Sequence, residues 1–301
     1  MGFAELRAQI STGRSRGLAV AWAVDPTVLR ASASALAEGL VGHVAVSGPK
    51  PLIQAAAEKA GVDISSWTIA AADHPAEGAH KAVELVRSGE CALLMKGSLG
   101  TAYLLRAVLH KEFGLRSSML LSHVAVIELP GGRLTTLTDA AMNIRPDLEQ
   151  KAAIVDNAIQ LAWSIGLVEP KVAILAAVET VNPKMPETVD AAALTQMAAR
   201  GQFSRKAVVD GPLAFDNAYS KAAAVKKGIS TPVAGEVDIF VVPEITAGNI
   251  LYKAFSYAAG FKTAGLVVGA KCPIVLTSRA DSEESKLNSI LLASMAADQT
   301  V

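Results

Sequence analysis

A polar turn near the end of the chain combines residue types that suit the binding of a small anion such as phosphate. Ser278, Arg279 and Asp281 stand in TSRADS, between an apolar run at 273–276 and a helical pattern that begins near Glu283. The planar, permanently charged guanidinium suits phosphate, free N–H groups at a helix N-terminus favour anions, and a carboxylate can accept a proton in a transition state. The alternative interpretation is an ordinary helix cap, with Ser278 or Asp281 as the N-cap and a solvated Arg279.

Two other turns join an apolar run to a helical pattern and carry residues suited to ligand binding. In KGSLGT, the residues Lys96, Gly97 and Ser98 resemble a phosphate cradle in general design, although the spacing matches neither the P-loop nor the dinucleotide fingerprint. In PEITAGN, Gly248 permits a ligand to approach the backbone closely, and Asn249 offers one acceptor and a donor pair. Each segment is also compatible with a plain connection, the second with a loop glycine and an asparagine cap.

The remaining signals for a site are weaker. Arg116 precedes an expected strand at 119–128 and is either a surface residue or an anion ligand. His123 lies within that strand and is expected to be a core histidine. The sequence has no cysteine and histidine spacing typical of zinc. Its Gly-x-Ser-x-Gly letters at 13–17 precede the expected strand at 18–23 and do not follow a strand, as a nucleophile elbow does. It therefore predicts no metal site and no serine nucleophile of the hydrolase type.

Composition argues against several classes of function. The chain has 301 residues, with 28 basic and 28 acidic side chains and 5% aromatic residues, so neither charge nor base-stacking surface favours nucleic acid or an anionic membrane. Cys91 and Cys272 stand in apolar runs and are expected to be buried and reduced. No apolar run reaches the roughly 20 residues of a transmembrane helix, and the N-terminus does not resemble a signal peptide. These features predict a cytoplasmic protein.

Short apolar runs alternate with longer helical patterns, which predicts βαβ units and a largely parallel sheet with helices on both faces. Asp25-Pro26 opens one helix with an N-cap followed by proline at the first helical position. A break lies near 140–146, where a β-rich stretch gives way to a helical pattern. The expected strands are 18–23, 41–46, 67–71, 92–95, 119–128, 172–178, 237–242, 265–268 and 274–276.

Several segments, in this order and at this spacing, resemble the phosphate acetyltransferase and phosphate butyryltransferase family. They are LLMKGSLGT, LLSHVAVIE, NIRPDLEQKAAIVDNAIQLAWSIG, VDGPLAFDNA, PEITAGNILYK and TSRADSEESKLNSI. The match runs from about residue 15 to the C-terminus, and LLSHVAV and the compact length are closer to the butyryl branch. The resemblance implies a two-lobed α/β fold of the isocitrate and isopropylmalate dehydrogenase type. Residues 1–140 and 271–301 would form the first lobe and residues 141–270 the second, with the active site in the cleft between them.

The implied activity is transfer of a short acyl group, acetyl to butyryl, between coenzyme A and inorganic phosphate. The resemblance implies direct transfer in a ternary complex, without an acyl-enzyme. Coenzyme A is then a substrate, and no tightly bound cofactor is expected. The same resemblance implies a homodimer that forms mainly through the second lobe.

The resemblance also implies roles for residues in two of the three turns. Arg279 would hold the phosphate, and Ser278 would donate a hydrogen bond to the reacting thiol or to the developing oxyanion. The Ala-Gly-Asn turn with Gly248 and Asn249 would lie near the substrate. Asp281 is the expected base toward the thiol.

The base and the second anion ligand are left open by the family pattern. The acetyl branch has its carboxylate further along than Asp281, and Glu284 stands nearer that place. Arg116 is a candidate second anion ligand in addition to Arg279.

Two other functions share these features. A non-catalytic protein that senses coenzyme A esters or acyl phosphates would keep the arginine and the glycine turns. An enzyme that transfers acyl groups from acyl carrier protein to phosphate would add an apolar tunnel and a basic docking patch.

Overall fold

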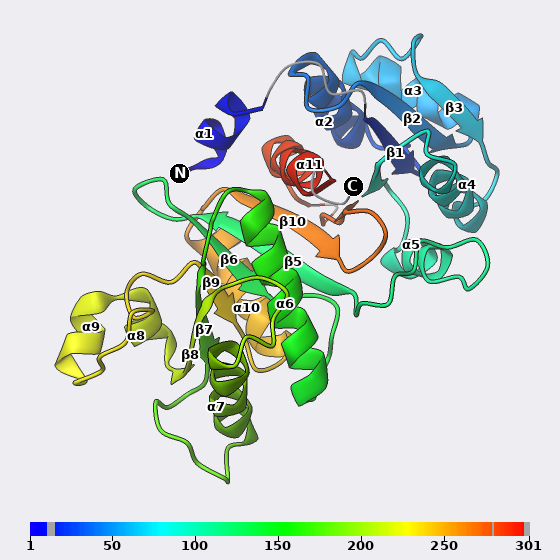
Figure 1. The fold of residues 1–301 in the computed structure, drawn as a ribbon. Helices are drawn as coiled ribbons and strands as arrows, with labels where there is room; N and C mark the ends of the chain where they lie inside the picture. Colours follow the sequence, from blue (N-terminus) through cyan, green and yellow to red (C-terminus); the bar gives the residue numbers. More distant parts are fainter. Residues whose placement is uncertain (11–15, 279, 298–301) are drawn as a thin grey trace. The chain divides into compact units, whose positions relative to one another are not determined.

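The computed structural model describes residues 1–10, 16–278 and 280–297, so Arg279 lies outside the described residues. Contacts within the chain divide it into two compact units. The terminal unit consists of Phe3–Met119 and Thr263–Val301, and the middle unit consists of Met1–Gly2 and Leu120–Lys262. Each unit has its own set of strands and covering helices (Figure 1).

The terminal unit is built on strands in the order β3-β2-β1-β4-β11-β10. Neighbouring strands are parallel, except that β10 and β11 are antiparallel. Every residue of β1 and β4 is buried, which explains why these strands are continuous apolar runs in the sequence. The strands are β1 (Gly17–Ala21), β2 (His43–Gly48), β3 (Thr68–Ala71), β4 (Leu93–Lys96), β10 (Thr263–Val268) and β11 (Ile274–Val275).

Helix α2 of the terminal unit begins where the sequence predicts a cap. Asp25 accepts a hydrogen bond from the Thr27 N–H at 2.7 Å, and Pro26 follows at the first helical position of α2. Helix α11 packs against β10 and α2, whereas α4 packs against β1 and β2. The helices are α1 (Phe3–Ala8), α2 (Pro26–Ala37), α3 (Lys50–Ala60), α4 (Pro75–Arg87), α5 (Thr101–Val108) and α11 (Glu283–Ala297).

The middle unit has strands in the order β5-β6-β9-β7-β8. β5 and β6 form an antiparallel pair, and the other neighbours are parallel. The strands are β5 (Ser122–Glu128), β6 (Leu134–Thr138), β7 (Lys171–Leu175), β8 (Val208–Leu213) and β9 (Ile239–Val241). The helices are α6 (Leu148–Ser164), α7 (Pro186–Ala199), α8 (Phe215–Tyr219), α9 (Lys221–Lys226) and α10 (Ile245–Lys253), which continues as the π-helix η1 (Ala254–Ala258).

An aromatic cluster lies at the centre of the middle unit. Phe240 on β9 is fully buried, and its ring centroid lies 5.2 Å from that of Phe215 and therefore within the range of aromatic pairs. Phe255 packs in the same cluster, 6.0 Å from Phe215. These contacts join β9 to α8 and η1.

Apart from Met1–Gly2, which group with the middle unit, the division between the units differs from the expected lobe boundaries at two places. Residues 120–140 group with the middle unit, because β5 pairs with β6 and β6 pairs with β9. Residues 263–270 group with the terminal unit, because β10 pairs with β11. Strand pairing, which a residue pattern does not reveal, sets both boundaries.

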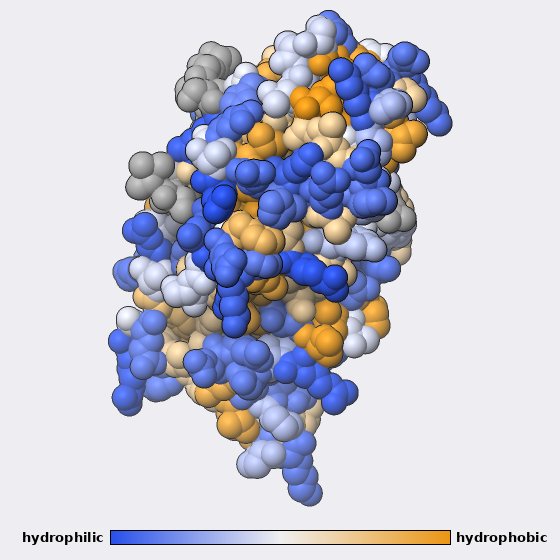
Figure 2. Space-filling view, turned by 90° about the vertical axis from the view of Figure 1, so that its right-hand side faces the viewer, coloured by the Kyte–Doolittle hydropathy of each residue, from blue (hydrophilic) through white to orange (hydrophobic). Residues whose placement is uncertain are grey.

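One face of the molecule is mainly polar. On the face shown in Figure 2, hydrophilic residues dominate and apolar residues form small patches between them. Within the described part of the chain, no helix has the length and apolar character needed to cross a membrane.

Candidate active site

The carboxyl ends of β4 and β11 bring two of the predicted turns to one edge of the terminal unit. The strands are parallel neighbours, with Leu94 opposite Ile274 and Met95 opposite Val275. The turns that follow therefore leave the sheet on the same side. In α/β proteins this edge is where ligands bind.

The turn after β4 lies against the end of β1. The Gly97 N–H donates to the carbonyl oxygen of Ala21 at 2.9 Å, and the Ser98 N–H donates to that of Trp22 at 3.0 Å. A Cβ on Gly97 would lie 2.5 Å from both of these oxygens, so only glycine fits. Lys96 is 6% exposed, and its Nζ lies 3.3 Å from the carbonyl oxygen of Gly97 and 3.4 Å from that of Leu99. Its ammonium group therefore lies beneath its own turn.

The turn after β11 is closed by its own residues. The Ser278 N–H donates to Asp281 Oδ2 at 2.7 Å, and the Asp281 N–H donates to the Ser278 carbonyl oxygen at 3.2 Å. Ser282 caps α11, because its Oγ accepts from the Ser285 N–H at 3.1 Å. Neither Ser278 nor Asp281 is the helix cap, so the alternative interpretation of these two residues is wrong. Ser278 is exposed at this edge.

The carboxylates next to this turn have different surroundings. Glu283 pairs with Arg30 of α2 at 2.8 Å, whereas Glu284 is exposed in the first turn of α11. Asp281 is half-buried, and its carboxylate accepts the hydrogen bond from the Ser278 N–H. Arg116, the predicted second anion ligand, is exposed, and its backbone pairs with Ala270.

Lys286, in the first turn of α11, contacts the same turn and was missed by sequence reasoning. Its side chain is 2% exposed, and its Nζ donates to the carbonyl oxygen of Asp281 and lies 3.5 Å from that of Ser278. Burial lowers the pKa of the Lys286 ammonium, while the carboxylates of Asp281 and Asp25 act in the opposite direction. The available signal was a lysine in the first turn of a helix, where the helix dipole disfavours a cation.

In the middle unit, the parallel neighbours β6 and β9 bring together Asp139–Asn143 and the start of α10. Thr138 lies opposite Val241 at the ends of these strands. A Cβ on Gly248 would lie 2.4 Å from the carbonyl oxygen of Asp139, so the helix packs directly on the turn. Asn249 Nδ2 donates to the Ala140 carbonyl oxygen at 3.2 Å.

Glu244, and not Asn249, caps α10. Its Oε1 and Oε2 accept from the N–H groups of Ala247 and Thr246, both at 2.8 Å. Burial raises the pKa of Glu244, but the hydrogen bonds from Thr246 and Ala247 outweigh this effect and hold the pKa below its usual range. The predicted asparagine cap is therefore wrong, and Asn249 instead ties α10 to the turn after β6.

Asp139 organises that turn and was also missed from the sequence. It is 3% exposed. Its Oδ1 accepts from the N–H groups of Ala141 and Met142, both at 2.9 Å, and its Oδ2 accepts from those of His123 and Asn143, both at 3.2 Å. Asn143 Nδ2 adds a hydrogen bond at 2.7 Å. A buried carboxylate with this many donors fixes the backbone around it.

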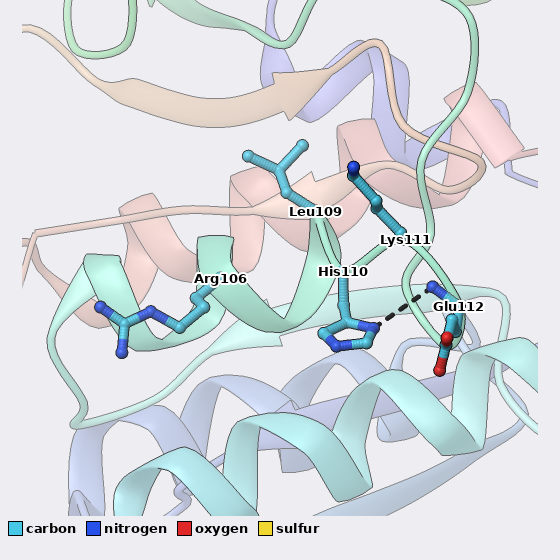
Figure 3. Close-up of a pocket in the computed structure, with 5 residues that line it drawn as sticks. All are labelled: Arg106, Leu109, His110, Lys111 and Glu112. Atoms are coloured by element: carbon cyan, nitrogen blue, oxygen red, sulfur yellow. Dashed lines mark hydrogen bonds between the residues drawn. The ribbon is translucent and has the colours of Figure 1, made fainter.

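The close-up in Figure 3 shows a pocket at the C-terminal end of α5, lined by Arg106, Leu109, His110, Lys111 and Glu112. Its volume is about 530 Å³, and it is open to solvent. His110 Nδ1 accepts from the Glu112 N–H at 3.3 Å. The predicted site residues of the β4 turn lie at the other end of α5, so this pocket is separate from them. Among the described residues, no group of His, Cys, Asp and Glu could hold a metal ion.

Comparison with known proteins gives a family model and close relatives. The model described as phosphate acetyl/butaryl transferase matches residues 66–294, a range that contains every candidate site residue. A phosphate butyryltransferase of Clostridium acetobutylicum is 45% identical over 98% of both chains. A phosphate acetyltransferase of Thermotoga maritima is 42% identical over 97% of this chain and 99% of the relative.

Solved structures agree with this match. A branched-chain phosphotransacylase from Enterococcus faecalis V583 has a TM-score of 0.82 at 37% identity, over 94% of this chain and 99% of that chain. A 4-hydroxythreonine-4-phosphate dehydrogenase from Burkholderia phymatum, at 14% identity, has a TM-score of 0.56 over 95% of this chain and 99% of that chain, which shows a shared fold alone. The predicted dehydrogenase-like α/β fold is thus confirmed. With a family model over most of its length and relatives above 40% identity, the chain belongs to the phosphate acetyl/butyryl transferase family.

Proposed function

We propose that this protein transfers a short acyl group between coenzyme A and inorganic phosphate: acyl-CoA and phosphate give acyl phosphate and CoA. The observation that carries the proposal is the family match over residues 66–294, together with 45% identity to a phosphate butyryltransferase over 98% of both chains. The acyl group ranges from acetyl to butyryl. Coenzyme A is a substrate, and the reaction requires no tightly bound cofactor.

The transfer is direct and occurs in a ternary complex. A phosphate oxygen attacks the thioester carbonyl carbon, the C–O bond forms, and the C–S bond breaks as the tetrahedral oxyanion collapses. The CoA thiolate leaves and takes up a proton. In reverse, a base removes the thiol proton before the sulfur attacks, because the thiolate is the nucleophile.

An acyl-cysteine intermediate has little support in the fold. Cys91 and Cys272 are both buried, and burial raises the pKa of each thiol to about 12. Such thiols stay protonated near neutral pH and are poor nucleophiles. The same burial agrees with the predicted reduced state of the two cysteines.

In the terminal unit, the turn after β11 is the centre of the proposed site. Ser278 is exposed there and donates to the reacting thiol or to the developing oxyanion, and Arg279 holds the phosphate. Asp281 takes the thiol proton, with Glu284 as the alternative base. Each preorganised donor of this kind typically stabilises the transition state by about 3 kcal/mol.

The other predicted residues bind the substrates. Lys96, Gly97 and Ser98 form the neighbouring turn at the same edge, and Arg116 provides a second cation for an anionic group. We propose that Gly248 and Asn249, in the first turns of α10, also bind substrate. We also propose a cytoplasmic location and a homodimer.

The test is release of CoA from acetyl-, propionyl-, butyryl- and isobutyryl-CoA, read with a thiol reagent, with and without phosphate. Release that requires phosphate, with one best acyl chain, supports the proposal and gives the chain length. Release without phosphate would indicate a thioesterase. Absence of release from a folded protein that still binds CoA would contradict the proposal and favour a sensor or an acyl carrier protein substrate.

A further inference from the structure

Lys286 is a buried cation in a place where helix stability does not favour one. It is the fourth residue of α11, within the first turn, where unpaired N–H groups and the helix dipole repel positive charge. Its side chain is nevertheless 2% exposed. Burying an ammonium group costs free energy unless hydrogen-bond partners replace the lost water. The partners of the Lys286 ammonium therefore indicate its role.

Those contacts are with the turn and not with a partner on the helix. Nζ donates to the Asp281 carbonyl oxygen and lies 3.5 Å from that of Ser278, which are the two ends of the turn. The negative ends of both carbonyl dipoles therefore point inward, toward the helix. A positive charge lies directly beneath the exposed side of the turn.

Lys151 offers a comparison within the same chain. It is also buried, at 6% exposed, and is also the fourth residue of its helix, α6. Its Nζ pairs with Asp190 Oδ2 at 2.7 Å, so its charge is neutralised by a side chain. The ammonium group of Lys286 instead contacts the backbone carbonyl oxygens of Ser278 and Asp281.

The neighbouring turn has the same design. Lys96 is buried and its Nζ lies within 3.4 Å of two carbonyl oxygens of the β4 turn, those of Gly97 and Leu99. Because β4 and β11 are parallel neighbours, the two turns leave the same edge of the sheet. This edge thus has two ammonium groups beneath two adjacent turns, which favours an anion above them.

We propose that Lys286 is a positioning residue for acyl transfer. It acts through the turn of Ser278 and Asp281, whose carbonyl groups it orients, and it adds positive potential where the phosphate and the oxyanion would lie. It does not touch the substrate. The inference rests on the proposed function, which places the reacting groups at this turn.

The test measures phosphate-dependent CoA release and thermal unfolding for matched variants. Lys286→Met keeps the apolar stem and removes the charge and donors, Lys286→Arg restores a charge, and Lys151→Met removes the other buried first-turn lysine. We expect Lys286→Met to lower kcat by about tenfold or more, with partial recovery in Lys286→Arg, because preorganised charge acts on the transition state. Lys151→Met is expected to lower the unfolding temperature and to keep kcat near wild type.

Two results from folded variants would overturn the inference, and two more apply if Lys286→Met does not fold. The first is a normal kcat in folded Lys286→Met, and the second is an equal loss of kcat in Lys151→Met without recovery in Lys286→Arg. If Lys286→Met does not fold, it is replaced by Lys286→Gln, which keeps hydrogen-bond donors but has no charge. A normal kcat in Lys286→Gln would also contradict the inference. Failure of both to fold would show that Lys286 supports the whole unit and not the turn.

Ser278→Ala is measured beside these variants to separate the two proposals. If Ser278→Ala is slow and Lys286→Met is normal, only the inference about Lys286 fails. If both are normal, the proposed site at this turn fails.

Discussion

Two turns at the carboxyl ends of strands, one in each unit, are organised by buried charges of opposite sign. After β6 in the middle unit, the carboxylate of Asp139 accepts hydrogen bonds from four backbone N–H groups. After β11 in the terminal unit, the ammonium of Lys286 binds two backbone carbonyl oxygens. Both side chains are almost fully buried.

The difference shows how a fold decides which backbone groups remain for a ligand. The Asp139 turn directs its N–H groups inward and leaves a carbonyl group, that of Ala140, to accept from Asn249. The Lys286 turn directs carbonyl groups inward over a positive charge. Of the two, the Lys286 turn is the one that suits an anion such as phosphate.

The largest effect is expected from Asp139→Ala, which leaves several buried donors without their acceptor. Removing the acceptor of buried hydrogen bonds in a charged network typically costs about 3–5 kcal/mol, so the chemical unfolding midpoint should fall sharply. Asp63→Ala is the matched control, because Asp63 accepts the Ser65 N–H at 2.9 Å on the surface. Similar shifts in both variants would show that burial of the Asp139 turn is unimportant.

Gly97→Ala should be the next most damaging change. The new Cβ would lie 2.5 Å from the carbonyl oxygens of Ala21 and Trp22, and forced packing of this kind typically costs about 1–3 kcal/mol. The displaced turn should also lower kcat. In Gly100→Ala, three residues later, the Cβ meets only the Tyr103 side chain at 3.5 Å, so unfolding and kinetics should stay near wild type. Equal behaviour of the two variants would contradict the close approach of the β4 turn to β1.

Asn249→Ala tests the link between α10 and the Asp139 turn. It removes one hydrogen bond, at 3.2 Å to Ala140, and the expected loss of stability is about 1 kcal/mol. If Asn249 also contacts substrate, kcat/KM should fall by more than this loss explains. Unchanged kinetics with reduced stability would limit Asn249 to a structural role.

The smallest effect is a pH dependence of stability due to Lys286. Its pKa in the folded protein lies below the usual value of 10.5. Between these two pKa values the unfolded chain binds more protons than the folded one, so the free energy of unfolding gains a contribution that rises with pH. Lys286→Met should lack this contribution in alkaline urea titrations. A constant difference between variant and wild type up to pH 10.5 would contradict the lowered pKa.

Much of the terminal unit could be predicted from the sequence. The apolar run at 92–95 lies within one residue of β4, and the Asp25 cap with Pro26 begins α2 as expected. The buried parallel strands are continuous apolar runs, which makes them easy to recognise. The family motifs also point to the turns after β4 and β11.

The remaining features depend on contacts that a local pattern does not contain. β6 has the sequence LTTLT and β8 has VVDGPL, so threonine in the first and Gly-Pro in the second obscure the apolar run. From the local sequence, Asp139 is expected to be an ordinary turn residue and Lys286 an exposed surface lysine. Their roles follow from burial and from the backbone groups that surround them.

The most direct test of the central claim is the rate of phosphate-dependent CoA release by Ser278→Ala. Ser278 is exposed, and among the described residues its Oγ accepts one long hydrogen bond, from the Ala280 N–H at 3.4 Å, so the change should leave the unfolding temperature near wild type. If acyl transfer takes place at the turn after β11, kcat/KM should fall by about tenfold or more. A folded Ser278→Ala variant with wild-type kcat/KM would contradict the placement of the reaction at this turn.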